Sequence, residues 1–237
     1  AAKMRYMSGG ALKVPMVMRC PSGATNRGAQ HAQSPETYFA HVPGLKVICP
    51  STAYDAKGMM KTAIRDDNPV IVFEHKLLYG SKRKEAGALN SAGEVPDGDY
   101  TVPFGKAAIR REGKDITIVA NLLMSYRAQE AAAELEKEGI SCEIIDPRTL
   151  VPFDYETVVE SVRKTGKLMI VHEDTYNCGW GAQVASYFAE HEIFLLDAPV
   201  VRVAALDTPA PFSPVLENYV IPSKERIMEE ARKLAKL

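Results

Sequence analysis

The sequence predicts an α/β fold in which parallel sheets are covered by helices. Short apolar runs of strand length alternate along the chain with segments whose apolar residues recur at spacings of three and four, the period of a helix. One run, Val70–Phe73, is apolar at every position, as expected of a strand with helices on both faces. Parallel strands are joined by right-handed crossovers, so the alternation indicates successive βαβ units.

The first part of the chain supplies three predicted strands and one predicted helix. We expect strands at Val14–Met18, Leu45–Cys49 and Pro69–Phe73. The helix between the last two begins after Ser51 or Thr52, because either hydroxyl can cap its first turn, and it ends before Pro69. Its apolar face is predicted to consist of Ala53, Ala56, Met59, Met60, Ala63 and Ile64.

A connection is predicted in the middle of the chain. Residues 79–103 are rich in Gly, Pro, Lys, Asp and Asn and have no apolar period. We therefore predict a first domain over residues 1–85, a linker over 86–105 and a second domain over 106–237. In the second domain the same patterns predict strands at 116–120, 142–145, 168–171 and 200–203. They also predict one helix that ends at Gly139 and three more over residues 154–163, 181–190 and 224–237.

The composition argues against several classes of partner. Lys and Arg total 29 against 30 Asp and Glu, a formal net charge of −1, so no basic excess favours nucleic acid or an anionic membrane surface. The apolar runs are far shorter than the roughly 20 residues that a helix needs to cross a bilayer. The four cysteines lie far apart without a Cys-x-x-Cys pair, which favours packed, reduced thiols and a reducing compartment.

The first candidate site is a loop that follows the first predicted strand. In doubly wound sheets ligands bind beyond the carboxyl ends of the strands. The loop Pro21–Ser34 is Gly-rich and carries His31 between two glutamines. Its glycines have the spacing of a P-loop, but Ala29 stands where that motif requires lysine, which argues against a nucleoside triphosphate. An imidazole titrates near neutral pH and can therefore donate a proton or a hydrogen bond to a ligand. The alternative is that His31 is a structural loop histidine.

Two further clusters are candidates for which a structural role is the simpler interpretation. His172–Asp174 follows an apolar strand and precedes a glycine-containing helix start, but consecutive residues do not share one face of a strand. Packing at the strand end or between subunits would explain these residues. At Ala63–Pro69 a helix end presents carbonyls beside a carboxylate and an amide, an oxygen set suited to a hard cation. A helix that stops before a strand would explain that cluster.

A series of short motifs runs through most of the chain. The motifs are Tyr6–Gly10, Gln30–Glu36, Pro43–Val47, Asp55–Gly58, Ala63–Pro69, Glu74–Tyr79, Ile145–Pro152, His172–Glu173 and Asp207–Pro209. Together they resemble the β subunit of the first component of 2-oxo acid dehydrogenase complexes, and the related acetoin dehydrogenase β subunit. The motifs occur in the same order as in that family, from near the first residue to about Pro222, so the resemblance is specific.

The resemblance implies an α2β2 enzyme that uses thiamine diphosphate to decarboxylate a 2-oxo acid, with pyruvate as the default substrate. The acyl group passes to a lipoyl arm of the dihydrolipoyl acyltransferase core. In this family the β subunit supplies a pyrimidine-binding domain, here expected within residues 1–85, and a transketolase C-terminal-type domain, here expected over 106–237. The α subunit holds magnesium and the diphosphate. Asp97–Asp99 does not match the family's magnesium motif, so magnesium is not assigned to this chain.

By residue-by-residue match, the resemblance also implies site residues. His31 corresponds to the family's active-site histidine, beside the reacting centre and facing the lipoyl arm. The family's structural potassium ion is bound largely through main-chain carbonyls, with polar side chains as further ligands. Its matching positions here are Met16, Ala63, Ile64, Asp66 and Asn68.

One departure from the family concerns catalysis. In the family a glutamate upstream of the Tyr6–Gly10 region hydrogen-bonds the aminopyrimidine of the cofactor. No residue of this sequence occupies that place, so no cofactor-binding residue is assigned to this chain. We therefore expect a pyrimidine-binding domain that lacks its N-terminal part, an incomplete sheet with exposed apolar surface, and a chain that is inactive by itself.

Two other functions remain open from the sequence. An acetoin dehydrogenase β subunit is indicated by Glu74–Tyr79 and Gly93–Pro96. A non-catalytic module that dimerises and docks the acyltransferase core is the second alternative. The resemblance implies a place in the bacterial cytoplasm or in the mitochondrial matrix.

Overall fold

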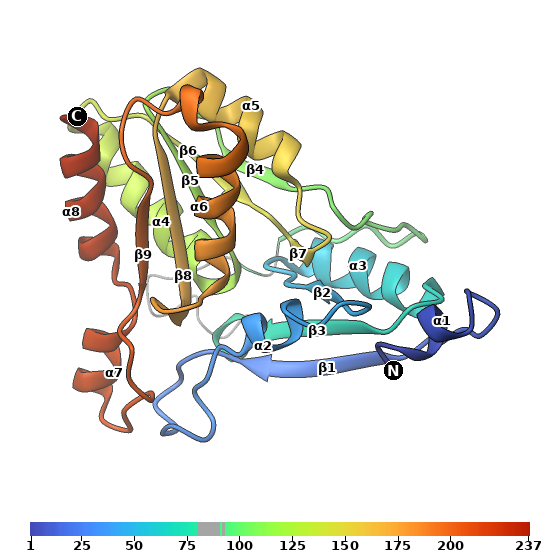
Figure 1. Cartoon of the computed structure of the whole chain (residues 1–237). Coiled ribbons are helices and arrows are strands. Elements are labelled where there is room, and N and C mark those ends of the chain that lie inside the picture. Colours follow the sequence, from blue (N-terminus) through green and yellow to red (C-terminus); the bar gives the residue numbers. More distant parts are fainter. Residues whose placement is uncertain (80–90, 92) are drawn as a thin grey trace.

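The computed structural model describes residues 1–79, 91 and 93–237. In these residues the strands form two sheets, with the orders β1-β3-β2-β7 and β4-β6-β5-β8-β9 (Figure 1). The predicted α/β class is confirmed. Each sheet also carries one antiparallel strand at an edge, β7 in the first and β4 in the second, which the apolar pattern did not predict.

The first sheet takes strands from both halves of the chain. Its members are β1 (Val17–Ser22), β3 (Val70–His75), β2 (Lys46–Ile48) and β7 (Thr149–Val151). The first three are parallel, and β7 pairs with β2 although it lies far along the chain. Around this sheet lie α1 (Met4–Met7), α2 (Glu36–Ala40), α3 (Ala53–Arg65) and the 3-10 turn η1 (Lys76–Leu78).

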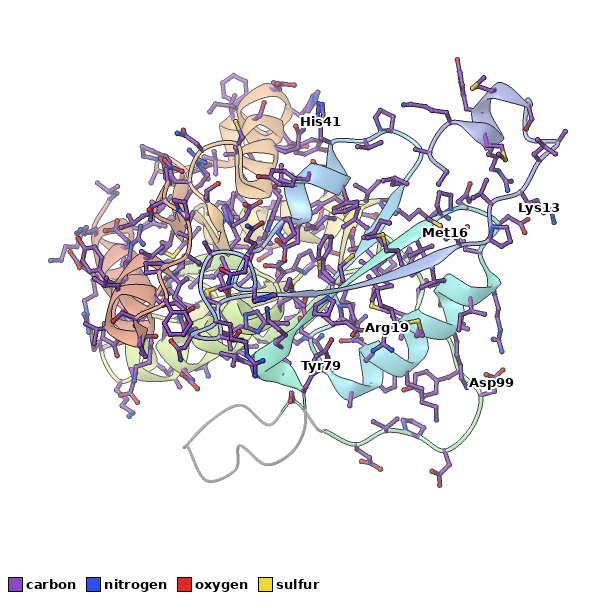
Figure 2. All side chains as sticks on the ribbon, turned by 90° about the horizontal axis from the view of Figure 1, so that it is seen from below. Lys13, Met16, Arg19, His41, Tyr79 and Asp99 are labelled. Atoms are coloured by element: carbon purple, nitrogen blue, oxygen red, sulfur yellow. The ribbon has the colours of Figure 1, made fainter. Side chains whose placement is uncertain are left out.

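The edge strand β1 is displaced from its predicted position at Val14–Met18. It begins at Val17 and continues past Arg19, whose guanidinium pairs with Glu74 of β3 at 2.8 Å. Tyr79 donates its hydroxyl to the same carboxylate at 2.6 Å, on the face seen in Figure 2. Polar side chains are tolerated on an edge strand, so the apolar pattern misplaced its ends. Met16 and Met18 are 39% and 42% exposed along this edge.

The helix α3 begins and ends where the sequence predicts. Thr52 caps it by accepting the N–H of Asp55. Met59 and Ala63 are buried against the first sheet, as expected. The expectation that Ile64 belongs to the same face is wrong, because one residue turns the helix by roughly 100° and leaves this side chain 64% exposed. Ala56 is exposed as well.

The second sheet is covered by helices on both faces. Its strands are β4 (Ala108–Arg111), β5 (Ile116–Ala120), β6 (Cys142–Asp146), β8 (Leu168–Thr175) and β9 (Val201–Ala205). The helices are α4 (Leu122–Glu136), α5 (Tyr155–Thr165), α6 (Trp180–His191), η3 (Ile193–Leu195), α7 (Pro214–Val220) and α8 (Lys224–Ala235). One core packs against α4 and α8, and another against α5 and α6 (Figure 1).

A shared core joins the two sheets. Phe73 of β3 and Ile145 of β6 belong to the same buried cluster, which also includes Trp180 at the start of α6. The predicted boundary at residues 85 and 86 lies outside the described residues, and residues 93–105 contain no helix or strand. In the part of the chain that the structure describes, no helix is both long enough and apolar enough to span a membrane.

Candidate functional site

The loop that carries His31 lies where strands of both sheets end. β1 ends at Ser22 and β3 at His75 in the first sheet, while β8 of the second sheet reaches Thr175. The loop between β1 and α2 is contacted by Lys76 of η1, Glu173 of β8 and Glu217 of α7. Its position agrees with the expectation that ligands bind beyond the carboxyl ends of parallel strands.

The His31 loop is closed at its neck by backbone hydrogen bonds. Gly23 donates its N–H to the carbonyl of Gln33 at 2.8 Å, and His31 donates to the carbonyl of Gly28 at 3.2 Å. Gly23 adopts a φ of +90°, in the left-handed region that favours glycine. The His31 side chain is exposed to solvent, and Lys76 donates its ammonium to the His31 carbonyl. The loop therefore fixes the backbone of His31 and presents its imidazole outward.

Two buried carboxylates hold the loop from the second sheet's side. Glu173 of β8 accepts the Ala24 N–H, and Glu217 of α7 accepts the Asn26 N–H through both oxygens, at 2.8 and 2.9 Å. Glu173 also accepts a hydrogen bond from His75 Nε2 at 2.8 Å. The backbone amides of Ala24 and Asn26 are thus occupied by protein carboxylates.

Hydrogen bonding decides which nitrogen of His75 carries a proton. The N–H of Leu77 donates to Nδ1 of His75 at 3.1 Å, so Nδ1 accepts and Nε2–H donates to Glu173. Burial opposes the charge on Glu173, but His75 and the Ala24 N–H outweigh it and lower the pKa of this carboxyl. Glu173 is therefore ionised at neutral pH.

The side chains of His172, Glu173 and Asp174, the second candidate cluster, contact three different parts of the structure. Glu173 joins the His31 loop, whereas the Nδ1–H of His172 donates to the carbonyl of Asp174 at 3.0 Å. The His172 ring is buried, with its centroid 5.1 Å from that of Trp180, and burial lowers its pKa to about 4. Asp174 accepts a hydrogen bond from Thr37 of α2. As expected from their spacing, the three residues do not form one convergent site.

A further buried acid, Glu36, lies near this cluster. Glu36, the first residue of α2, is only 3% exposed. Burial, together with the nearby charge of Asp174, raises the pKa of its carboxyl to about 8. A proton is therefore retained at this position well above the usual range for a glutamate.

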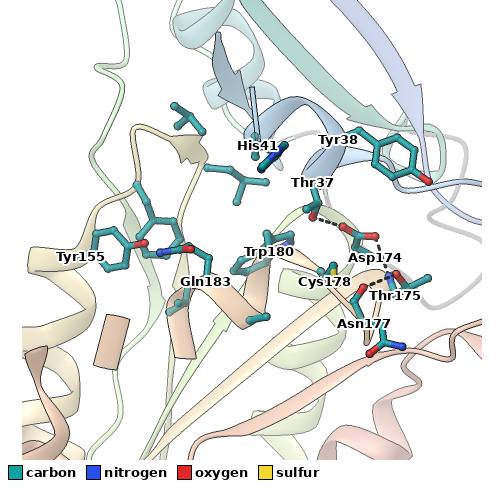
Figure 3. Close-up of a pocket in the computed structure, with 17 residues that line it drawn as sticks. Thr37, Tyr38, His41, Tyr155, Asp174, Thr175, Asn177, Cys178, Trp180 and Gln183 are labelled. Atoms are coloured by element: carbon teal, nitrogen blue, oxygen red, sulfur yellow. Dashed lines mark hydrogen bonds between the residues drawn. The ribbon is translucent and has the colours of Figure 1, made fainter. Parts of the chain in front are cut away.

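Two cavities open beside these residues. A groove of about 860 Å³ lies between α2 and α6, with Trp180, Gln183 and Asp174 among its lining residues (Figure 3). The dashed lines there include the Thr37–Asp174 bond. A smaller cavity of about 440 Å³ borders the His31 loop at Gln33 and reaches Glu173.

The predicted potassium ligands gather at the opposite end of the first sheet. Ala63 and Ile64 lie in the last turn of α3, and Asp66 caps the helix by donating its N–H to the Ala63 carbonyl at 3.3 Å. The carbonyl of Met16 accepts from Val70 N–H at 2.8 Å, beside Asn68. Figure 2 shows Met16 at this end of β1.

The carboxylate in this cluster already has partners. Asp66 accepts hydrogen bonds from the backbone and side chain of Asn68, at 2.8 and 2.7 Å, and pairs with the ammonium of Lys46. Burial opposes its charge, but these contacts lower the pKa of Asp66. A bound cation would share this carboxylate with Lys46.

Sequence reasoning missed three residues that hold the His31 loop. His75, Lys76 and Glu217 all contact it or its anchor. His75 and Lys76 follow the apolar run of β3, so the rule that pointed to His31 also pointed to them. Glu217 lies in a short helix that the periodicity did not reveal, and no pattern distinguishes it from other acidic residues.

Comparison with protein-family models divides the chain in two. Residues 1–82 match the transketolase pyrimidine-binding domain, and residues 105–227 match the transketolase C-terminal domain. A solved structure, a split-gene transketolase described as an inactive β4 tetramer, is similar with a TM-score of 0.74 at 27% identity. The similarity covers 95% of this chain and 68% of that one.

Curated relatives match over nearly the whole chain. The β subunit of acetoin:2,6-dichlorophenolindophenol oxidoreductase from Cupriavidus necator is 48% identical over 100% of this chain and 67% of the relative. The 2-oxoisovalerate dehydrogenase β subunit of Bacillus subtilis is 44% identical, over 99% and 70% respectively. The β subunit of the pyruvate dehydrogenase E1 component of Rickettsia felis is 44% identical, over 99% and 69%.

The chain belongs to the β-subunit family of 2-oxo acid and acetoin dehydrogenases. The resemblance stated from the sequence motifs is thereby confirmed, and so is the transketolase-like fold. The chain spans about two thirds of the length of these relatives. The roles of His31 and of the potassium ligands in this chain remain predictions.

Proposed function

We propose that this chain acts as the β subunit of a thiamine diphosphate-dependent 2-oxo acid dehydrogenase, together with an α subunit in an α2β2 assembly. The observation that carries the proposal is the exposed His31, presented on an anchored loop at the carboxyl ends of strands, in a chain of this family. The acyl product would pass to a lipoyl group of a dihydrolipoyl acyltransferase core. Bacterial and mitochondrial relatives are both known, and we favour the bacterial cytoplasm over the mitochondrial matrix.

The contacts of the His31 loop fit a division of the cofactor between two subunits. A diphosphate needs free backbone N–H groups or cations, but the Ala24 and Asn26 amides are occupied by Glu173 and Glu217. We therefore propose that the diphosphate and its magnesium ion are held by the α subunit. When bound, thiamine diphosphate supplies the electron sink for decarboxylation. No residue of this chain is assigned to it.

His31 is proposed as the catalytic residue of this chain. Its backbone is fixed by Lys76 and Gly28, while its side chain is exposed to solvent, where a substrate from outside the chain can reach it. An imidazole near neutrality can donate a proton to a developing negative charge or accept one from a thiol. Such a group typically contributes about 10²–10⁴-fold to a rate.

The oxygen cluster at the end of α3 is proposed to bind a potassium ion. Helix-terminal carbonyls at Ala63 and Ile64, with Asp66, Asn68 and the Met16 carbonyl, form a donor set suited to a hard monovalent ion. The ion would tie the end of α3 to the starts of β1 and β3. Replacing potassium with lithium should then lower the thermal midpoint, and an unchanged midpoint would remove the reason for this assignment.

Substrate choice separates two versions of the proposal. Pyruvate is the default, and acetoin is the alternative, favoured by a relative that is 48% identical and named for acetoin. A role as a docking module without catalysis would leave the anchored, exposed His31 unexplained. The full-length β chain should therefore be combined with candidate α subunits and assayed with pyruvate, 2-oxoisovalerate and acetoin.

The test of the proposed function combines binding and activity. Thiamine diphosphate should bind the mixture of both subunits and not this chain alone, as measured by titration calorimetry. In the mixture, His31→Ala should reduce acyl transfer to a lipoyl acceptor by about 10²-fold or more. Binding to neither preparation would overturn the assignment as a shared cofactor site, and full activity of the variant would overturn the role of His31.

A further inference from the structure

Glu173 connects three separate pieces of the chain. From β8 of the second sheet, it accepts the N–H of Ala24 with Oε1 and the Nε2–H of His75 with Oε2. Both side chains are almost fully buried, with 7% of Glu173 and 1% of His75 exposed. Charge-assisted hydrogen bonds are short and directional, so these contacts fix Ala24 and β3 relative to the second sheet.

The neck of the loop links the fixed Ala24 to the backbone near His31. The neighbouring Gly23 bonds to Gln33, two residues beyond His31, at 2.8 Å. Gly23 also lies so close to the anchor that a Cβ there would be 2.0 Å from Nε2 of His75. The neck therefore lies directly against the His75–Glu173 pair and has no room to move toward it.

The residue next to His75 also contacts His31. Lys76 directly follows His75 and donates its ammonium to the carbonyl of His31. A shift of His75 would therefore move the neck and this second contact together. Glu217 holds Asn26 independently, but it contacts neither His75 nor Lys76 among the described hydrogen bonds.

We propose that Glu173, through His75 and Ala24, is a positioning residue that sets where the His31 imidazole lies relative to the reacting centre. This inference rests on the proposed function of His31. A misplacement of about 1 Å can cost roughly 10²-fold in rate, although no group that touches the substrate is removed. The positioning role therefore predicts a loss of kcat without a loss of substrate binding.

The central variant is Glu173→Gln in the full-length β chain, combined with an α subunit. An amide has a single acceptor oxygen, so one of the two donors, Ala24 N–H or His75 Nε2–H, must face the amide NH₂ group. We expect kcat to fall by on the order of tenfold to a hundredfold with KM unchanged. Amide hydrogen exchange, measured on the β chain, should accelerate in residues 23–33 and stay unchanged in α4.

A matched control is Glu143→Gln. Glu143 of β6 is another buried glutamate, 1% exposed, which pairs with Lys164 and accepts the Gly113 N–H at 3.3 Å. Its contacts are with residues distant from the His31 loop. This variant should lower the thermal midpoint while leaving exchange in residues 23–33 and kcat unchanged.

A double variant separates positioning from a general structural effect. In a His31→Gln background, Glu173→Gln should have little further effect on kcat, because the group that it positions is gone. A full additional loss there, or unchanged exchange in residues 23–33, would overturn the proposal. If Glu173→Gln does not fold, His75→Phe keeps a ring beside Gly23, removes the donor, and should give the same loss of kcat and faster exchange.

The two proposals fail in different ways. If His31→Gln alone retains full activity, the catalytic role of His31 is wrong and the positioning role falls with it, even if exchange in the loop responds to Glu173→Gln. If His31→Gln is inactive but Glu173→Gln keeps its kcat, only the positioning role is wrong.

Discussion

Asp55 of α3 and Arg148, in the turn between β6 and β7, form an ion pair of 2.8 Å that joins the two halves of the chain. Arg110 of β4 binds the same Asp55 and also Asp146, the latter at 2.7 Å. Both carboxylates are fully buried. The packing of the halves therefore depends on a chain of ion pairs with buried carboxylates as well as on the shared apolar core.

Asp55→Asn should strongly destabilise the protein. The substitution leaves two guanidinium groups beside a neutral amide in a buried place, which costs about 3–5 kcal/mol in comparable cases. The free energy of unfolding in urea measures this loss. Asp99→Asn is the control, because Asp99 pairs with Lys61 and Arg65 at an exposed site (Figure 2), where solvent weakens ion pairs. Equal small effects of both variants would contradict the structural role of Asp55.

His172 should make stability depend on pH in the acid range. Its pKa is about 4 in the folded chain against an ordinary value of 6.5. As the pH falls from 6.5 to 4, the unfolded chain takes up a proton that the folded chain does not, so stability declines, by about 3 kcal/mol in all. His172→Asn keeps a donor for the Asp174 carbonyl and should flatten this dependence. The exposed His41, changed to Gln, should leave it intact, and identical profiles for both variants would contradict this account.

Glu36 should make the protein less stable as the pH rises. Its pKa is about 8 in the folded chain and 4.5 ordinarily, so the folded chain keeps a proton that the unfolded chain releases as the pH rises between these values. Glu36→Gln should therefore be more stable than the parent, by on the order of 4 kcal/mol at pH 8 and little at pH 4.5. Thermal midpoints across this range test it, with the exposed Glu156→Gln as control. A gain that does not grow with pH would contradict it.

Gly23→Ala should damage the loop more than an alanine at a comparable glycine. At Gly23 the left-handed backbone adds to a clash in which the new Cβ would lie 2.0 Å from the His75 ring. Gly9 also has a positive φ, +63°, but a Cβ there would meet no atom within 4 Å, so Gly9→Ala should cost only about 1–2 kcal/mol of backbone strain. Thermal unfolding compares the two. Equal costs would show that the loop neck can move away from His75.

Most strands and helices of the second half could be predicted from the sequence because their signals are local. In β5, Ile116 and Ile118 face α4 while Val119 faces α5, so the strand is apolar on both faces. Its one polar residue, Thr117, is also buried and bonds to hydroxyls of α5. Asp154 caps α5, and Gly166 ends it at a φ of +68°. Such caps and periods depend only on residues that are close together in the sequence, so they can be recognised from the sequence alone.

The antiparallel edge strands and the anchor of the His31 loop depended on contacts between distant residues. β7 is three residues long and becomes a strand only because β2 lies beside it. Glu173 and Ala24 are separated by 149 positions, and Glu217 and Asn26 by 191. No local pattern marks a glutamate as the acceptor for a particular distant N–H.

By itself, the sequence determined the α/β class, most of the strands and helices, the family and the prominence of His31, because periodicity, caps and motifs are properties of short segments. Only the tertiary structure decided that Glu173 and His75 meet, that His172 is buried away from them, and that Asp55 binds the arginines of the other half. These outcomes follow from how two sheets pack against each other. Packing assigns burial and partners to polar residues, and their chemistry depends on both.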